Sequence, residues 1–254
     1  PDVIKAHMTP AALKTPDTDW HIPLLYNFAR ALNATVISAN YSRFVIDLNR
    51  PPDNATLYPG QIKFSLCPEE TVDGGCVYKD GYALSAAEEK ERLEKYWHPY
   101  HDELARQIER VKNIHGYALL YDAHSIKSVC PRLFEGVLPD INIGTNKGKS
   151  CAPAMEAAAM KPAQGGNFTS ILNGRFIGGH ITRHYGAPDK NIHALQMELT
   201  QKNYMDEEST VFDDTRASRI RPVLKNVIQA MLDWGAAEYT PARTTPAQGL
   251  KPNR

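Results

Sequence analysis

The stretch Tyr117-Ala-Leu-Leu-Tyr-Asp-Ala-His-Ser-Ile-Lys-Ser-Val129 carries the clearest structural signal in the chain. Its apolar run from Tyr117 to Tyr121 predicts a buried strand that ends in Asp122 and His124. In open α/β sheets, ligands bind beyond the carboxyl ends of the strands. We therefore expect these two side chains at a metal or substrate site.

The size and composition are those of an ordinary globular protein. The 254 residues are 42% hydrophobic, which is ample for a core. Lysine plus arginine equals aspartate plus glutamate at 29 each, so no overall field attracts nucleic acid or an anionic membrane. No apolar segment approaches the ~20 residues of a membrane span, and no signal-peptide pattern is present, so we expect a cytoplasmic location. The four cysteines form no CxxC pair and predict free thiols.

Two helices are predicted before this strand. Apolar residues at helical spacing follow Asp19, a preferred cap residue. Ser85 and Glu88 form a capping box, and apolar positions at steps of three and four continue to Gly116. Pro99 interrupts this second pattern and predicts a kink, or two helices with Pro99 in the first turn of the second.

Three other segments predict strands: Thr35–Ser38, Phe168–Leu172 and Ile192–Leu199. In the last of these, Gln196 and Glu198 alternate with apolar residues and so share one polar face. Strands that alternate with helices predict an α/β fold with a mixed, mostly parallel sheet flanked by helices.

The C-terminal part of the chain predicts one long helix and a tail. The helix runs roughly from Asp214 to Trp234, and Gly235 lies past its end. Residues 236–254 are rich in Pro, Thr, Ala and Gly and predict a loosely structured tail. No internal repeat or long linker precedes the tail, so residues 1–235 are predicted to form a single domain.

Asp19 and His124 are candidate zinc ligands, because zinc binds His, Cys and carboxylates and a catalytic site keeps one position open for water. A plain helix cap is the alternative for Asp19. Asp122 and Ser125 are able to orient the second nitrogen of His124. Glu198 is a candidate general base, because a carboxylate between apolar neighbours needs a partner or a raised pKa. A salt bridge to an arginine is its alternative.

Arginines form a second group of candidates. Four of them lie in segments rich in Gly, Asn, Pro or Tyr, where binding residues gather: Arg43, Arg50, Arg175 and Arg183. A guanidinium matches a carboxylate with two parallel hydrogen bonds, so these residues predict a small anionic substrate, such as one with two carboxylates. Ordinary surface ion pairing is the alternative. The glycine pair before His180 permits a close approach of the backbone to a ligand.

Eight segments together closely resemble the N-formylglutamate amidohydrolase family. They are Asp17-Thr-Asp-Trp-His21, Tyr41-Ser-Arg-Phe-Val-Ile-Asp-Leu-Asn-Arg-Pro-Pro52, Leu57-Tyr-Pro-Gly-Gln61, Asp122-Ala-His-Ser-Ile126, Leu133-Phe-Glu-Gly136, Asn142-Ile-Gly-Thr-Asn146, Asn173-Gly-Arg-Phe-Ile-Gly-Gly-His-Ile-Thr-Arg-His-Tyr-Gly186 and Ala194-Leu-Gln-Met-Glu198. The resemblance implies hydrolysis of N-formyl-L-glutamate to formate and L-glutamate, the last step of one bacterial route of histidine degradation. It also implies a zinc-peptidase-like (phosphorylase/hydrolase-like) α/β fold.

The resemblance also assigns roles. It makes His124 a metal ligand, Asp19 the carboxylate ligand and Glu198 the general base. It makes Arg50, Arg175 and Arg183 candidates for binding the substrate carboxylates. In the amide hydrolysis that we expect, His180, His184 or an arginine stabilises the oxyanion, and the sequence leaves the choice among them open. Zinc or another divalent ion is the implied cofactor, and N-formyl-L-glutamate is the implied small-molecule partner.

A third metal ligand is expected upstream of Pro1. Members of the family carry a Pro-His-Ser-Gly segment there, and its histidine is the implied ligand. Within the chain, His21 is the nearest substitute.

Two other functions stay open at this stage. One is a related zinc amidase or carboxypeptidase that acts on another N-acyl amino acid or a cell-wall peptide, since the same metal and base serve that reaction. The other is a non-catalytic binder of acidic amino acids that keeps the arginines without the metal. The sequence leaves the oligomeric state open.

Overall fold

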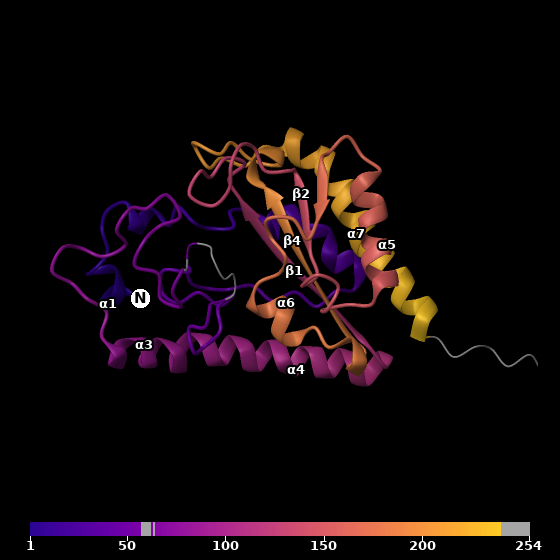
Figure 1. Ribbon diagram of the computed structural model, residues 1–254, viewed down its shortest axis with the longest axis horizontal. Coiled ribbons are helices and arrows are strands. Elements are labelled where there is room, and N and C mark those ends of the chain that lie inside the picture. Colours follow the sequence, from indigo (N-terminus) through magenta and orange to yellow (C-terminus); the bar gives the residue numbers. More distant parts are fainter. Residues whose placement is uncertain (57–61, 63, 240–254) are drawn as a thin grey trace, which may run out of the picture.

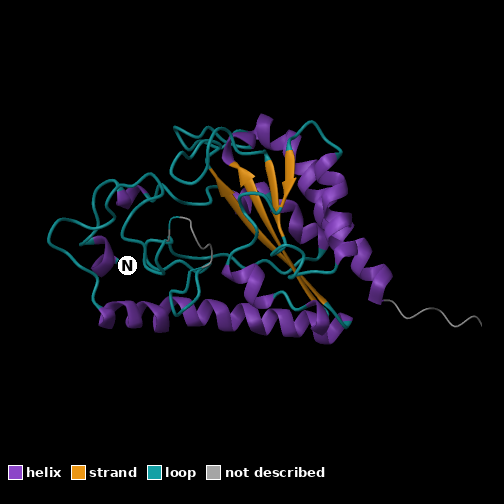
Figure 2. Cartoon of the chain, in the orientation of Figure 1, coloured by secondary structure: helices purple, strands orange, loops and turns teal. Residues whose placement is uncertain are grey.

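A four-stranded sheet lies at the centre of the computed structural model, which describes residues 1–56, 62 and 64–239 (Figures 1 and 2). The strands are β1 (Ala118–Ile126), β2 (Ile141–Gly144), β3 (Ser170–Leu172) and β4 (Ile192–Thr200), in the order β1-β4-β2-β3. β1 is parallel to β4 and β2 is parallel to β3, whereas β2 and β4 are antiparallel. The predicted mixed sheet is confirmed.

Helices cover both faces of this sheet (Figure 1). α5 (Pro153–Gln164) and α7 (Asp214–Tyr239) pack on one face, and α4 (His98–His115) and α6 (His180–Tyr185) pack on the other. The shorter helices are α1 (Asp2–Lys5), α2 (Ile22–Leu25) and α3 (Ala86–Arg92). Among the described residues, no helix combines the length and the apolar character needed to cross a bilayer.

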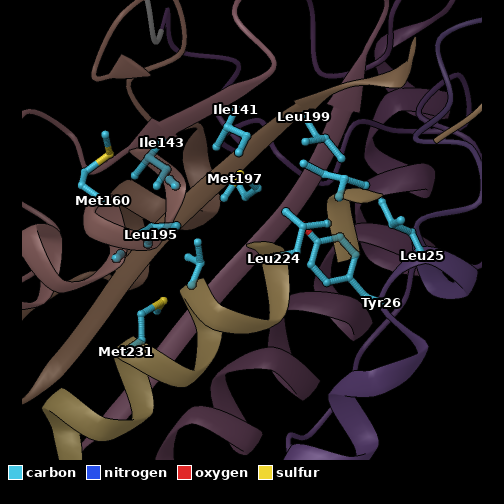
Figure 3. Packing of buried hydrophobic residues seen from close by; sticks show 14 of the residues in the cluster. Leu25, Tyr26, Ile141, Ile143, Met160, Leu195, Met197, Leu199, Leu224 and Met231 are labelled. Carbon is cyan, nitrogen blue, oxygen red and sulfur yellow. The ribbon is translucent and has the colours of Figure 1, made fainter. Parts of the chain in front are cut away.

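The main core lies between the sheet and the α5–α7 pair (Figure 3). Leu195, Met197 and Leu199 of β4 point into it and are fully buried. Burial of each such side chain stabilises the fold by about 1.5–3 kcal/mol. Because side chains alternate along a strand, Gln196 and Glu198 point to the opposite face, toward α6. The apolar side of β4 thus packs in the core and holds Gln196 and Glu198 in the interior on its other side.

A second apolar cluster lies beside the sheet, in the loop-rich part of the chain near α1 and α3 (Figure 1). Phe44, Val45 and Ile46 are buried in it. Buried Arg92 donates to the carbonyl of Val45 at 3.2 Å, and Trp97 Nε1 donates to the carbonyl of Arg50 at 3.0 Å. These contacts fix both ends of the segment that joins this cluster to the polar face of the sheet.

The predictions for the helix before β1 are confirmed. Ser85 and Glu88 form the capping box at the start of α3. A π-helical turn over residues 93–97 separates α3 from α4, and Pro99 lies in the first turn of α4. Gly116 ends α4 with a φ of 82°, a left-handed conformation that favours glycine.

Three local predictions are wrong. Asp19 does not cap a helix, because α2 starts after His21 and no side chain caps it. Residues 35–38 form no strand. α7 continues through Gly235 to Tyr239, and Gly235 lies against the Tyr117 ring, where a Cβ atom would be only 2.4 Å from Cε2. The predicted tail therefore begins inside a helix, and residues 240–254 lie outside the described residues.

The boundary of β1 also differs from the prediction. Asp122 and His124 lie inside the strand rather than beyond its end, because pairing with β4 continues to the Ile126–Thr200 pair. β2 and α5 were not predicted. The residues Phe168–Leu172 do contain a strand, but only Ser170–Leu172 pair with β2.

Candidate active site

Two rows of polar positions cross the sheet on the face that carries α6. The strand register places His124 of β1 opposite Glu198 of β4, and Glu198 opposite Asn142 of β2. The next row contains Asp122 and Gln196. Because residues two apart in a strand share a face, both rows present their side chains on the same side of the sheet. Pairing of strands far apart in the sequence thus assembles the candidate site.

His124 lies between two carboxylates. Its Nδ1 is 3.5 Å from Asp19 Oδ2, and its Nε2 is 3.0 Å from Asp122 Oδ1. Asn49 Nδ2 is 2.9 Å from the same Nε2. Burial disfavours the charged imidazole, but Asp122 and Asp19 outweigh it and raise the pKa of His124 well above its usual value. The imidazole is therefore held in place on both sides.

Asp19 reaches this site from the loop before α2. Its Oδ1 accepts a hydrogen bond of 2.6 Å from the backbone N–H of Ser125 in β1, which leaves Oδ2 directed at His124. The Asp19 side chain is 42% exposed. The carboxylate is thus fixed by one oxygen and open to a ligand at the other.

The Asp19 and His124 pair has the spacing of two ligands of one metal ion. Two donors at ~2.0–2.1 Å from a tetrahedral zinc ion lie about 3.4 Å apart, and the observed distance is 3.5 Å. Asp122 on the far nitrogen of His124 matches the carboxylate that commonly orients a zinc-bound histidine. No group of three His, Cys, Asp or Glu side chains suited to a metal occurs within residues 1–56, 62 and 64–239.

His21 does not supply the third donor. Its Nε2 is 2.8 Å from the carbonyl of Thr210, and its φ of 60° turns the residue into the left-handed region. The described residues therefore offer two candidate donors for a metal ion, Asp19 and His124, together with the groups that orient them.

Glu198 is a buried carboxyl group with only 7% of its surface exposed. Its Oε2 accepts a hydrogen bond of 3.0 Å from Gln196 Nε2, and Gln196 Oε1 accepts one of 2.6 Å from the backbone N–H of Gly179. Burial raises the pKa of Glu198 to about 7, although His124 opposes the rise. A group with this pKa is suited to accept and return a proton near neutral pH.

A cavity of about 1220 Å³ opens over these residues. Its lining contains Asp19, His124 and Glu198 together with Arg43, Arg50 and Arg175. The structure therefore brings six of the predicted site residues to one cavity. Arg183, His180 and His184 are not part of its lining.

Three of the predicted arginines lie close to a backbone or carboxylate oxygen. Arg50 Nε is 3.6 Å from the buried carboxylate of Asp47. Arg175 Nε donates to the carbonyl of Leu133 at 2.6 Å, and Arg183 Nε donates to the carbonyl of Gly178 at 2.8 Å. Arg50 and Arg175 are thus oriented at the cavity, and Arg183 is bound to the loop that precedes α6.

His180 and His184 stack on each other in α6, with ring centroids 5.0 Å apart. His180 is buried, and its ring also lies 5.5 Å from that of His101. Its backbone N–H donates to the carbonyl of Asn49 at 3.3 Å. In this position His180 supports the segment that contacts His124.

Comparisons with known proteins identify the family of this chain. The sequence model of the family described as "N-formylglutamate amidohydrolase" matches residues 1–205, which include every candidate site residue. The chain belongs to the N-formylglutamate amidohydrolase family.

Relatives and solved structures extend this result. The chain is 49% identical to N-formylglutamate deformylase of Pseudomonas putida over 94% of this chain and 90% of that protein. It is 45% identical to N-formylglutamate deformylase of Pseudomonas aeruginosa over 93% of this chain and 89% of that protein. The crystal structure of N-formylglutamate amidohydrolase from Ralstonia eutropha superimposes with a TM-score of 0.74 at 22% identity, covering 87% of this chain and 84% of that one. That likeness concerns the fold.

Several residues of this amidohydrolase site were not predicted as such. Asn49 Nδ2 contacts His124, and Asn49 Oδ1 accepts a hydrogen bond of 2.8 Å from the backbone N–H of Ile181 in α6. Gln196 was recognised only as a neighbour of Glu198 on the polar face. Asn49 stands directly before Arg50 in a segment that resembles the family, and this position was its only signal in the sequence. The segment Leu57–Gln61, which also carries the resemblance, lies outside the described residues.

Gly179 is predicted to be intolerant of a side chain. A Cβ atom there would lie 2.5 Å from Asn49 Nδ2, so the asparagine must move away from His124. We expect Gly179→Ala to lower the free energy of unfolding by about 1–3 kcal/mol and kcat by at least about tenfold. Gly165→Ala is the matched control, because its nearest neighbour would be 3.5 Å from the new Cβ. Equal effects of the two changes in denaturant titrations and formate assays would contradict the prediction.

The buried histidines predict a loss of stability in acid. Burial lowers the pKa of His101 and of His180 to about 4, whereas an unfolded histidine titrates near ~6.5. Between these values the unfolded chain binds more protons, so the free energy of unfolding falls as the pH drops from 6.5 toward 4. Each histidine contributes at most about 3 kcal/mol to this loss.

Urea titrations at several pH values measure this effect. His180→Met is expected to flatten the pH dependence, because His180 Nε2 has no hydrogen-bond partner among the described residues and none is lost. The exposed His115, replaced with glutamine, is the control. A slope that stays the same in His180→Met would show that the acid sensitivity arises elsewhere.

Proposed function

We propose that this chain hydrolyses N-formyl-L-glutamate to formate and L-glutamate, with a zinc ion held by Asp19 and His124. The observation that carries the proposal is the position of Glu198, a buried carboxyl group directly opposite His124 in the β1–β4 register. A base next to a metal-ligand pair is the arrangement needed to hydrolyse an amide. The deformylase names of the two Pseudomonas relatives support the choice of substrate.

When bound, zinc polarises a carbonyl oxygen and lowers the pKa of a water ligand toward neutrality. Glu198 then accepts the proton of the attacking water, because its pKa of about 7 allows both uptake and release. Gln196 holds Oε2 of this carboxyl group, so that Oε1 is the oxygen that exchanges the proton. Glu198 returns the proton to the amine nitrogen as the C–N bond breaks.

Arg50 and Arg175 are proposed to bind the substrate carboxylates, since both line the cavity. Arg50 Nε lies within ion-pair distance of Asp47, and Arg175 Nε donates a hydrogen bond to the carbonyl of Leu133. These contacts bias the direction of each guanidinium before the substrate arrives. An oriented cation converts binding energy into placement of the small formyl group over the reacting residues. Arg183 lies outside the cavity lining and is proposed to hold the loop before α6.

The third zinc donor is proposed to be the histidine of the Pro-His-Ser-Gly segment that the resemblance places upstream of Pro1. We further propose that the fold is of the zinc-peptidase-like type and that the enzyme works in the cytoplasm. Zinc titration of this chain beside one that carries the upstream segment tests the ligand assignment. Tight binding by both would contradict it.

The activity itself is tested by formate release. We expect N-formyl-L-glutamate to be hydrolysed with a higher kcat/KM than N-acetyl- or N-succinyl-L-glutamate, because the reacting group must fit between His124 and Glu198. Preference for a longer acyl group would indicate a related zinc amidase. Glutamate binding without hydrolysis of any of the three would indicate a binding protein.

A further inference from the structure

A buried carboxylate, Asp47, joins two arginines at the edge of the cavity. Its Oδ2 forms an ion pair with Arg43 Nη2 and lies 3.6 Å from Arg50 Nε. Its Oδ1 accepts a hydrogen bond of 3.0 Å from the backbone N–H of Asn49, the residue that contacts His124. Burial disfavours the charged form of Asp47, but Arg43 and Arg50 outweigh it and lower its pKa. The carboxylate therefore stays ionised and fixes both arginines.

Arg43 is fixed at one nitrogen and open at the others. Its side chain is 32% exposed and lines the same cavity as Asp19, His124 and Glu198. Among the described residues, Asp47 is its only hydrogen-bond partner, and the bond uses Nη2. The N–H groups of Nε and Nη1 are therefore available to a ligand, while the planar guanidinium is already oriented.

The charge of Arg43 acts on the reacting residues. It opposes the rise in the pKa of Glu198, which burial causes, and Asp19 is among the carboxylates that raise the pKa of Arg43. Arg50 and Arg175 also line the cavity but are assigned to the substrate carboxylates, whereas Arg183 and both histidines of α6 lie outside the cavity lining. Of the four predicted arginines, Arg43 is thus the one in the cavity that remains for the charge that develops between Asp19, His124 and Glu198.

We propose that Arg43 is a catalytic residue that donates hydrogen bonds to the formyl oxygen as it becomes an oxyanion, with Asp47 as its positioning residue. This inference rests on the proposed function. As the water oxygen bonds to the formyl carbon, the water proton passes to Glu198 and the carbonyl π pair moves onto the oxygen. When the C=O bond re-forms, the C–N bond breaks and the nitrogen takes the proton from Glu198. A cation positioned in advance stabilises the charged step more than the neutral substrate.

Replacement of Arg43 should therefore affect kcat and spare KM. We expect Arg43→Gln to lower kcat about 10²–10³-fold, with KM within about threefold of the wild type. Arg43→Lys keeps the charge and the pair with Asp47, and should recover about tenfold of that loss. The control is Arg106→Gln, which removes a surface ion pair of α4 with Glu103 and should leave kcat within about twofold.

A sulfur substitution tests the contact with the oxygen directly. N-thioformyl-L-glutamate replaces the formyl oxygen with a weaker hydrogen-bond acceptor. If Arg43 donates to this atom, the ratio of kcat values for the oxygen and sulfur substrates should be at least about tenfold smaller in Arg43→Gln than in the wild type. An unchanged ratio in both Arg43 variants, or a rise in KM with kcat unchanged, would overturn the proposal.

Separate measurements test the role of Arg43, the folding of the variants and the proposed function. Affinity for L-glutamate, measured by calorimetry, shows whether each variant keeps a folded site, and Arg43→Lys serves if the glutamine variant does not fold. Formate release by the wild type tests the proposed function alone. If the wild type hydrolyses a different N-acyl amino acid, the same kcat and sulfur ratios are measured with that substrate, so the two proposals fail separately.

Discussion

Glu198→Gln is expected to lower kcat for N-formyl-L-glutamate by roughly 10³-fold, within the range that a general base contributes. Glutamine has nearly the same shape as glutamate and keeps the acceptor for Gln196, but it cannot take a proton. KM should change little, because the substrate carboxylates are assigned to Arg50 and Arg175 rather than to Glu198. Steady-state formate assays measure both constants.

A second glutamate-to-glutamine change, outside the candidate site, serves as the control in these assays. Glu94 is exposed between α3 and α4, so Glu94→Gln should leave kcat within about twofold. If Glu198→Gln retains turnover within about tenfold of the wild type while its affinity for L-glutamate is intact, Glu198 is not the general base. The free energy of unfolding of Glu198→Gln should be at least that of the wild type. The change removes a buried ionisable group, and the hydrogen-bond partner of Glu198 in β4 is the neutral side chain of Gln196.

The sequence predicts the place of Glu198 on the polar face of β4, because the signal for that place is local. Alternation with Met197 and Leu199 identifies the polar face of β4, and a strand shows this alternation without its partners. The end of the strand that carries His124 was predicted too early, because the prediction placed the end of the strand at its polar residues. β4 pairs with β1 through Ile126, and this pairing is a property of two segments rather than of one.

Contacts between distant segments could not be predicted. Asn49 lies 132 positions before Ile181, whose N–H it accepts, and no local pattern relates the two. The link from Gly179 through Gln196 to Glu198 depends in the same way on how the loop before α6 meets β4. Thr35–Ser38 has the composition of a strand, but strands exist only as pairs, and this segment forms no ladder.

The supports of His124 and Glu198 meet at one place, where Asn49 and Gly179 are in contact. Asn49 is bound to α6 and touches His124, whereas Gly179 is bound to Gln196 and so fixes Glu198. A Cβ on Gly179 would strike Asn49, so the absence of a side chain there lets both supports coexist. We infer that the spacing between His124 and Glu198 depends on this contact as well as on the sheet.

Removal of the proposed metal ligands is the second change with a large expected effect. We expect His124→Ala to abolish tight zinc binding and to lower kcat/KM at least about 10³-fold, because the imidazole supplies one of the donors of the site. Asp19→Ala should act in the same direction. Asp122→Asn, which alters only the group on the far nitrogen of His124, should weaken zinc binding by about 10–100-fold and keep measurable activity.

Metal analysis of the purified variants, followed by chelation of the wild type and addition of zinc, measures these effects. Chelation is expected to remove the activity and zinc to restore it. His115→Ala, at the exposed end of α4, is the control for loss of a histidine. The decisive result is the order of zinc affinities, which should fall further in His124→Ala than in Asp122→Asn. If His124 had only a structural role, both variants would lose similar stability and keep the zinc content of the wild type. Stoichiometric zinc in both His124→Ala and Asp19→Ala would place the metal elsewhere and leave Glu198 without its proposed partner.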